Sequence, residues 1–345
     1  MKDKVIPHSR PTLGKEEAQA VEEVVRSGYI AQGDKVKEFE DELARFVGVK
    51  GAVVTNSGLS ALHLGLVAMG IGPGDEVLLP SFVCSAILNA VYQTGAGPNL
   101  CDVELESFNI SSESIKDTRT DNARAVIVPH MFGSPADLEK IEGTGIPIIE
   151  DCAHSIGAMY GDKRVGSVGR FSILSFYACK MIACGEGGAF LSNDEDLLQI
   201  ARDRRSYDEK DHYKLRYNYK MTDIQAALGL VQLKKFPEMI KKRKELAARY
   251  DEAFKDMDIK LPRGEFDHVY YRYVIRTEKD MSGIKEKGVM AGKPVFKPLH
   301  RYLELRSGFK NTDRAYSTSL SIPIYPSLTE EEQGRVIEAV KDSLS

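Results

Sequence analysis

The sequence lacks the marks of several large classes of protein. No apolar segment approaches the length of a transmembrane helix, and residues 1–5 contain no apolar region of the signal-peptide kind. The net charge of -4 gives no basic footprint for nucleic acid. A Gly-x-Gly-x-x-Gly fingerprint and a Walker-type phosphate loop are both absent, which argues against a plain dinucleotide-binding fold. We therefore expect a cytoplasmic protein that binds neither membranes nor nucleic acid.

Cysteine is scarce as well, and its pattern predicts no metal site. The five cysteines are an odd number and include no Cys-x-x-Cys pair of the metal-binding kind. We interpret them as reduced thiols in and near the core, as in proteins of a reducing compartment. Cys179 and Cys184 flank Lys180, where a thiol nucleophile is conceivable, but packing is the simpler interpretation.

What the chain does contain is a regular alternation of strands and helices. Short apolar runs, separated by helical or polar stretches, occupy residues 52–55, 76–80, 98–102, 125–129, 147–151, 172–177 and 189–192. This alternation predicts an α/β fold with a mostly parallel central sheet. A long helix opened by Thr222-x-x-Gln225, which has capping-box form, is expected to break at Pro237. We therefore predict a large domain over residues 1–236 and a smaller C-terminal α+β domain over residues 237–345.

Four features fall at the carboxyl ends of the predicted strands, where ligands bind in such sheets. They are a small-residue turn at residues 58–60, Phe82, Asp151 and Lys180. The turn joins a strand to an apolar helix, so its free N–H groups and the positive end of the helix dipole suit a phosphate. Lys180 stands between an apolar strand and a glycine-rich turn, where partial desolvation would favour its nucleophilic amine. By itself this stretch fits a surface lysine better, and the other three features reverse that interpretation.

Pyridoxal 5'-phosphate requires all four features. Its phosphate needs a helix N-terminus, its ring a flat apolar partner, its pyridine nitrogen an acid and its aldehyde a lysine. An acid at Asp151 would stabilise the protonated pyridine nitrogen by a charge-assisted hydrogen bond. The ring would then accept the electron pair of a carbanion formed at the substrate carbon. Each feature is weak alone, but their combination in this order is hard to obtain from a generic α/β protein.

Nearly the whole chain also resembles a known family, in a series of short blocks. The blocks are residues 57–64, 150–158, 175–180, 185–189, 217–227, 298–300 and 320–323. They are similar to the DegT/StrS family of nucleotide-sugar aminotransferases, which depend on pyridoxal phosphate and have the aspartate aminotransferase (type I) fold. The block Glu-Asp-Cys-Ala-His-Ser-Ile-Gly-Ala and the block Ser-Phe-Tyr-Ala-Cys-Lys are highly specific together.

The resemblance implies the roles of the residues nearest the chemistry. Lys180 would hold the cofactor as a Schiff base and, once displaced, would move the proton between the substrate carbon and the cofactor carbon. Asp151 would pair with the pyridine nitrogen. Phe82 would stack on the cofactor ring.

The resemblance also implies how the phosphate is bound. Ser60 and Ser175 would contact it, together with the turn residues Gly58 and Leu59. Asn218 would reach the phosphate held by the neighbouring subunit, which makes a homodimer with shared active sites the catalytic unit. The alternative for Asn218 is a loop asparagine that satisfies its own backbone.

Three departures from the family pattern bear on these roles. His154 stands where the family often has glutamine, and it could still hydrogen-bond the 3-hydroxyl of the cofactor. Leu59 stands where threonine is usual, so one hydroxyl is missing from the phosphate turn. Residues 276–300, where contacts with the acceptor sugar are expected, form a shorter stretch than is usual in the family.

The function implied is transfer of an amino group from an amino acid, glutamate in the leading hypothesis, to a nucleotide-linked keto sugar. One alternative is a sugar dehydratase of the same family, but those enzymes carry histidine where Lys180 stands. A second alternative is a regulator that binds the cofactor without turnover. The presence of Lys180, Asp151 and Ser175 counts against it.

Overall fold

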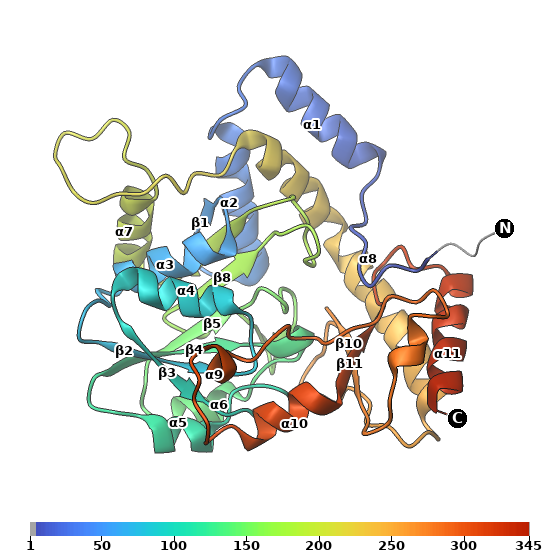
Figure 1. Ribbon diagram of the computed structural model, residues 1–345. Coiled ribbons are helices and arrows are strands. Elements are labelled where there is room, and N and C mark those ends of the chain that lie inside the picture. The colour runs from blue at the N-terminus through green and yellow to red at the C-terminus, as the bar shows by residue number, and fades with distance from the viewer. Residues whose placement is uncertain (1–4, 345) are drawn as a thin grey trace.

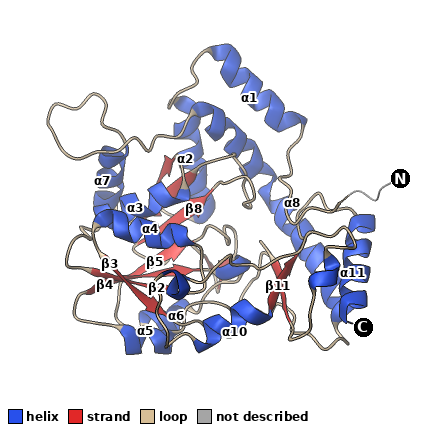
Figure 2. Cartoon of the chain, in the orientation of Figure 1, coloured by secondary structure: helices blue, strands red, loops and turns tan. Residues whose placement is uncertain are grey.

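A seven-stranded sheet forms the centre of the larger part of the molecule (Figures 1 and 2). The computed structural model describes residues 5–344; residues 1–4, which enter the argument against a signal peptide, lie outside that range. From edge to edge the strands are β1 (Gly51–Thr55), β9 (Gly188–Ser192), β8 (Phe171–Ser175), β5 (Ile148–Asp151), β4 (Ala123–Pro129), β2 (Glu76–Pro80) and β3 (Gly97–Cys101). β9 runs antiparallel to both neighbours, and the other pairs are parallel. The mostly parallel sheet predicted from the sequence is therefore confirmed.

Helices cover both faces of this sheet, which explains why its strands are apolar runs. Val53 and Val54 are both fully buried, one on each face of β1. On the face of Val53 lie α3 (Gly58–Ala68), α4 (Ser85–Thr94) and α7 (Glu195–Arg205). On the face of Val54 lie α2 (Asp34–Val47), α5 (Ser112–Thr118), α6 (Leu138–Glu142) and the first half of α8 (Asp223–Phe254).

The C-terminal part of the chain has a hydrophobic cluster of its own around a two-stranded sheet. β10 (Tyr273–Arg276) and β11 (Ser319–Ile322) pair antiparallel, and α11 (Glu330–Leu344) packs with the second half of α8 in this cluster. Ile6 belongs to the same cluster and forms a parallel bridge with Val289. The N-terminal segment therefore lies against the C-terminal part of the chain (Figure 1).

The helix α8 does not break at Pro237, contrary to the sequence-based expectation. It begins with the predicted capping box of Thr222 and Gln225 and continues without interruption to Phe254. A proline inside a helix costs about 3 kcal/mol. Pro237 faces solvent, while Phe236 and Phe254 on either side of it are fully buried, so packing of the apolar face outweighs that cost. The domain boundary at residues 236 and 237 stays a prediction.

The remaining elements are short or lie at the periphery. They are α1 (Lys15–Ser27), β6 (Met159–Tyr160), β7 (Lys163–Arg164), α9 (Leu299–Tyr302), α10 (Lys310–Thr318) and the 3-10 turns η1 (Met131–Gly133) and η2 (Ser282–Ile284). Among the helices of the described chain, none combines the length and the apolar character needed to cross a membrane.

Candidate active site

One cavity brings together most of the residues that the sequence singles out. It has a volume of about 330 Å³ and lies where β5 and β8 end, with the start of α3 and the segment before β10 in its wall. The predicted residues that line it are Gly58, Leu59, Asp151, His154, Ser175 and Lys180. The predicted residues that do not line it are Ser60, Phe82 and Asn218. Sequence reasoning missed Cys84, Tyr271, Arg272 and Phe296, which also line the cavity.

The turn before α3 forms a small cradle at one end of the cavity. A Cβ added to Gly58 would lie 3.0 Å from Ser175 Cβ and 3.3 Å from Ser175 Oγ, so glycine allows the turn to approach Ser175 closely without crowding. The N–H groups of Gly58 and Leu59 precede the first intrahelical bond, which Ala61 donates to the carbonyl of Ser57. The cradle thus offers N–H groups, a hydroxyl and a helix N-terminus, which suit a phosphate.

The hydroxyl of Ser60 is engaged within the turn. Ser60 Oγ donates to Asn56 Oδ1 at 2.7 Å and lies 2.9 Å from Ser57 Oγ, while the Ser60 N–H donates to Ser57 Oγ. Ser60 therefore shapes the cradle from behind, and a direct contact with a phosphate stays a prediction.

Lys180 lies in the turn that follows β8, half-buried at the edge of the cavity. Its backbone N–H donates to the carbonyl of Tyr177 at 2.8 Å, which fixes the turn. Its Nζ lies 5.0 Å from the centre of the Tyr271 ring, over the ring face. The amine is therefore directed into the cavity beside an aromatic wall, where an aldehyde could reach it.

Asp151 ends β5 and is buried in the same cavity. Burial raises the pKa of its carboxyl, although the N–H of Ala153 at 2.9 Å and the charge of Lys180 act in the opposite direction. A buried carboxylate of this kind gains from a cationic partner in the cavity. A protonated pyridine nitrogen is such a partner, so the residue fits the cofactor predicted from the sequence.

His154 supplies a flat ring to the cavity, three residues after Asp151. Its ring stacks on that of Tyr271, with centroids 4.3 Å apart and planes 18° apart. Burial, followed by the charges of Lys180 and Arg272, lowers the pKa of His154 well below its ordinary value. His154 is therefore neutral at neutral pH and has one N–H to donate.

Phe82 does not reach the cavity wall. Its side chain is 0% exposed and packs against Phe108 and Phe132, with ring centroids 5.7 and 6.4 Å away. Cys84, two residues further along the same loop, is the residue that faces the cavity. The structure thus does not support the stacking role predicted for Phe82, and the flat ring beside Asp151 is that of His154.

Asn218 lies outside the cavity but close to the phosphate cradle. It is exposed, and its carbonyl accepts a hydrogen bond of 3.2 Å from Asn56 Nδ2, next to the turn. Its predicted contact with a phosphate in a neighbouring subunit stays a prediction.

A buried trio near the cavity has the composition of a metal site, but two of its members are already engaged in hydrogen bonds. His130, Glu150 and Cys152 place ligand-type atoms within 4.8 Å of one another. His130 Nδ1 accepts the N–H of Ala136, so its Nε2 donates to Glu150 Oε2 at 3.1 Å. The Glu150 oxygens also accept the backbone N–H groups of Gly166, Val168 and Gly169. His130 and Glu150 therefore tie loops to β5.

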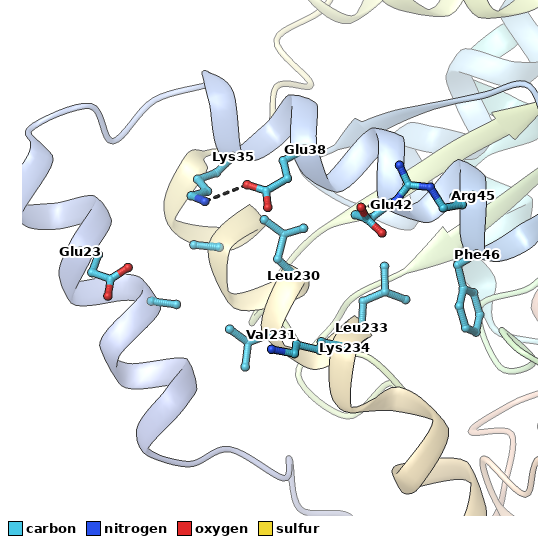
Figure 3. A pocket seen from close by; sticks show the side chains of 12 residues that line it. Glu23, Lys35, Glu38, Glu42, Arg45, Phe46, Leu230, Val231, Leu233 and Lys234 are labelled. Atoms are coloured by element: carbon cyan, nitrogen blue, oxygen red, sulfur yellow. Dashed lines mark hydrogen bonds and ion pairs between the residues drawn. The ribbon is translucent and has the colours of Figure 1, made fainter.

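A larger cavity of about 560 Å³ lies between α1, α2 and α8 (Figure 3). Its floor is aliphatic, with Leu230 and Leu233 of α8, and its rim is charged. Lys35 and Glu38 on the rim form an ion pair of 2.7 Å with each other. None of the residues that the sequence assigns to chemistry lines this cavity, so its size does not make it the candidate active site.

Comparison with known proteins identifies the family of the chain. Residues 11–341 match the DegT/DnrJ/EryC1/StrS aminotransferase family. The chain belongs to this family. It is 35% identical to the spore coat polysaccharide biosynthesis protein SpsC of Bacillus subtilis (strain 168), over 98% of this chain and 96% of SpsC. The resemblance noted in the sequence is thereby confirmed.

Solved structures of aminotransferases share the whole fold. The aminotransferase TlmJ from Streptoalloteichus hindustanus superposes with a TM-score of 0.93 at 29% identity, over 98% of both chains. PseC from Helicobacter pylori, an aminotransferase involved in the biosynthesis of pseudoaminic acid, gives 0.92 at 26% identity over 99% of both chains. Spr1654 from Streptococcus pneumoniae, solved in its PMP-form, gives 0.93 at 26% identity, over 98% of this chain and 97% of that one.

Proposed function

We propose that this aminotransferase uses pyridoxal 5'-phosphate to transfer an amino group from glutamate to a nucleotide-linked keto sugar. The observation that carries the proposal is the convergence of Lys180, Asp151 and the Gly58 cradle on one cavity at the ends of parallel strands. Family relatives support the substrate class, since SpsC is named for polysaccharide biosynthesis and Spr1654 is described as a sugar aminotransferase. Spr1654 has been solved in both a PLP-form and a PMP-form, which supports the cofactor.

When bound, pyridoxal phosphate supplies an aldehyde for the lysine and a ring that takes up an electron pair from the substrate carbon. Lys180 would hold the cofactor through its amine, and its Nζ, when free, would carry the proton to and from the substrate carbon. Asp151 would accept a hydrogen bond from the protonated ring nitrogen. The N–H groups of Gly58 and Leu59 and the hydroxyl of Ser175 would hold the phosphate.

We further propose that two copies of the chain form the catalytic unit, with Asn218 acting in the site of the partner. The loop between α7 and α8 carries Asn218 and projects from the body of the molecule (Figure 1). Tyr207 and Tyr213 in this loop are 58% and 92% exposed. Exposed aromatic side chains of this kind are common at interfaces between chains. A cytoplasmic location also stays a prediction, and it agrees with five cysteines that are all free thiols.

The function is tested by supplying the purified holoenzyme with glutamate and a panel of nucleotide-linked keto sugars. Glutamate alone should convert the cofactor to its amine form, and the correct sugar should reverse that change while gaining nitrogen. A product that has lost water without gaining nitrogen would support the dehydratase alternative. Absence of both half-reactions with every donor and acceptor would contradict an aminotransferase and favour the regulator.

A further inference from the structure

Arg272 is a cation in the active-site cavity that none of the proposed steps uses. It lines the same cavity as Lys180 and comes from the segment just before β10. Its Cζ lies 5.1 Å from the centre of the Tyr271 ring, and Lys180 Nζ lies 5.0 Å from the same centre. Lys180 Nζ and Arg272 Cζ therefore lie close to the same ring, and the distance between them cannot exceed the sum of 5.0 and 5.1 Å.

The guanidinium of Arg272 is held in place but not neutralised. No carboxylate pairs with it anywhere in residues 5–344. Its Nη1 lies 3.0 Å from both ring nitrogens of His8, and because a guanidinium only donates, the unprotonated nitrogen of His8 accepts. Burial, with the charge of Arg272, lowers the pKa of His8 to about 4, so this partner is uncharged at neutral pH. Ser321 Oγ, 2.8 Å from His8 Nε2, fixes the ring of His8 in turn.

Among the charged residues in the cavity wall, Arg272 is the one available to bind an anionic group of a substrate. The other charged residues in its wall are Asp151 and Lys180. Asp151 is assigned to the ring nitrogen of the cofactor, and the cradle at Gly58 and Ser175 to its phosphate. An arginine without an acidic partner favours a carboxylate, which it can bind through two parallel hydrogen bonds. The amino donor must bring its amino group to the position of Lys180, and it carries a carboxylate on the same carbon.

We propose that Arg272, oriented by His8, binds a carboxylate of the amino-acid donor. This inference rests on the proposed aminotransferase function and adds the residue that holds the amino-acid donor in the cavity. His8 is a positioning residue, because it acts on the donor through Arg272. An anionic group of the acceptor is the competing occupant of Arg272, and the experiment separates the two.

The first measurement uses glutarate, a dicarboxylate that has no amino group and cannot react. Calorimetric titration of the holoenzyme should show that Arg272→Gln binds glutarate about 10- to 150-fold more weakly than wild type, as expected for loss of a charge-assisted hydrogen bond. The glutarate affinity of Arg272→Lys should lie between those of wild type and Arg272→Gln, since lysine keeps the charge but lacks the paired N–H donors of a guanidinium. Arg10→Gln is the matched control: Arg10 pairs with Glu332 at 3.2 Å and does not line the cavity, so its loss should leave glutarate affinity unchanged.

The second measurement follows single turnovers with glutamate and, separately, with the nucleotide-linked sugar. The donor step should need a higher glutamate concentration in Arg272→Gln, with a smaller effect on its limiting rate. Wild-type affinity for glutarate in Arg272→Gln, no glutarate binding by wild type, or a defect confined to the sugar step would each overturn the inference. Binding of glutarate through Arg272 without transamination of glutamate would instead contradict the proposed function and leave the anion site standing. Far-UV circular dichroism checks that the variants are folded.

Discussion

Truncation of Phe82 separates the stability of the fold from binding of the cofactor. The ring is 0% exposed and is enclosed by Phe108 and Phe132. Phe82→Ala removes it from a close-packed cluster, which costs about 3–5 kcal/mol. At about 2–4 °C per kcal/mol for a domain of this size, the melting temperature should fall by roughly 6–20 °C. Affinity for pyridoxal phosphate, measured on the folded protein well below that temperature, should stay within about threefold of wild type.

His154→Ala is the matched comparison, because His154 is the flat ring that lines the cavity. It should weaken cofactor binding by about 3- to 10-fold, the range expected for loss of one aromatic contact. Melting of the cofactor-free protein is followed by circular dichroism, and binding by the absorbance of the cofactor. The argument is refuted if Phe82→Ala melts within about 2 °C of wild type and yet binds the cofactor more than about tenfold more weakly. That result would place the ring of Phe82 on the cofactor.

Four further outcomes are expected. Borohydride should fix the cofactor on the peptide that contains Lys180, and Lys180→Ala protein that still forms the reduced adduct at the wild-type level would refute that assignment. Asp151→Asn should bind the cofactor but lose most of its single-turnover rate, because an amide does not hold the pyridine nitrogen protonated; near-normal rates would mean that Asp151 is structural. Mixed dimers of Lys180→Ala and Asn218→Asp chains should recover about a quarter of wild-type activity after subunit exchange, since about half of random dimers are mixed and each has one intact site; activity equal to the sum of the parents would contradict a shared site. Burial and then the charge of Lys244 lower the pKa of His268 to about 3. The free energy of unfolding should therefore fall as the pH drops below about 6.5, because the unfolded chain then takes up a proton that the folded chain does not. His268→Gln should flatten this loss, as measured by the melting temperature between pH 5 and 7.

The parts of the site that are local in sequence could be predicted, and the parts that depend on distant contacts could not. The cradle at Gly58 follows from a strand, a small-residue turn and a helix, all within a few residues, and the structure brings it against Ser175. Tyr271 lies about a hundred residues beyond His154, and no periodicity or spacing indicates that the two rings stack. Pairings of this kind are set by how the C-terminal part packs on the sheet.

Phe82 and Pro237 show two places where a local rule does not anticipate the packing. β2 ends at Pro80, so the strand alternation that orients side chains no longer applies at Phe82, and packing with other aromatic rings directs it into the core. A proline inside a helix removes one hydrogen bond and usually breaks the helix, but the buried stripe of α8 continues on both sides of Pro237 and the helix does too. In both cases burial of a large aromatic face outweighs the local preference.

The adjacent acids Glu150 and Asp151 show how one strand divides two roles that the sequence presents as a single motif. Successive side chains of β5 point to opposite faces of the sheet. The carboxylate of Glu150 accepts hydrogen bonds from His130 and from three backbone N–H groups. Burial acts to raise the pKa of Glu150, but these contacts outweigh it and lower the pKa. The carboxylate of Asp151 accepts a hydrogen bond from one backbone N–H group, that of Ala153, and burial raises the pKa of Asp151. The charge of Glu150 is therefore engaged in holding loops in place, whereas the charge of Asp151 is left for a cation that enters the cavity. This asymmetry supports the prediction that Asp151, and not Glu150, would keep a bound pyridine ring protonated.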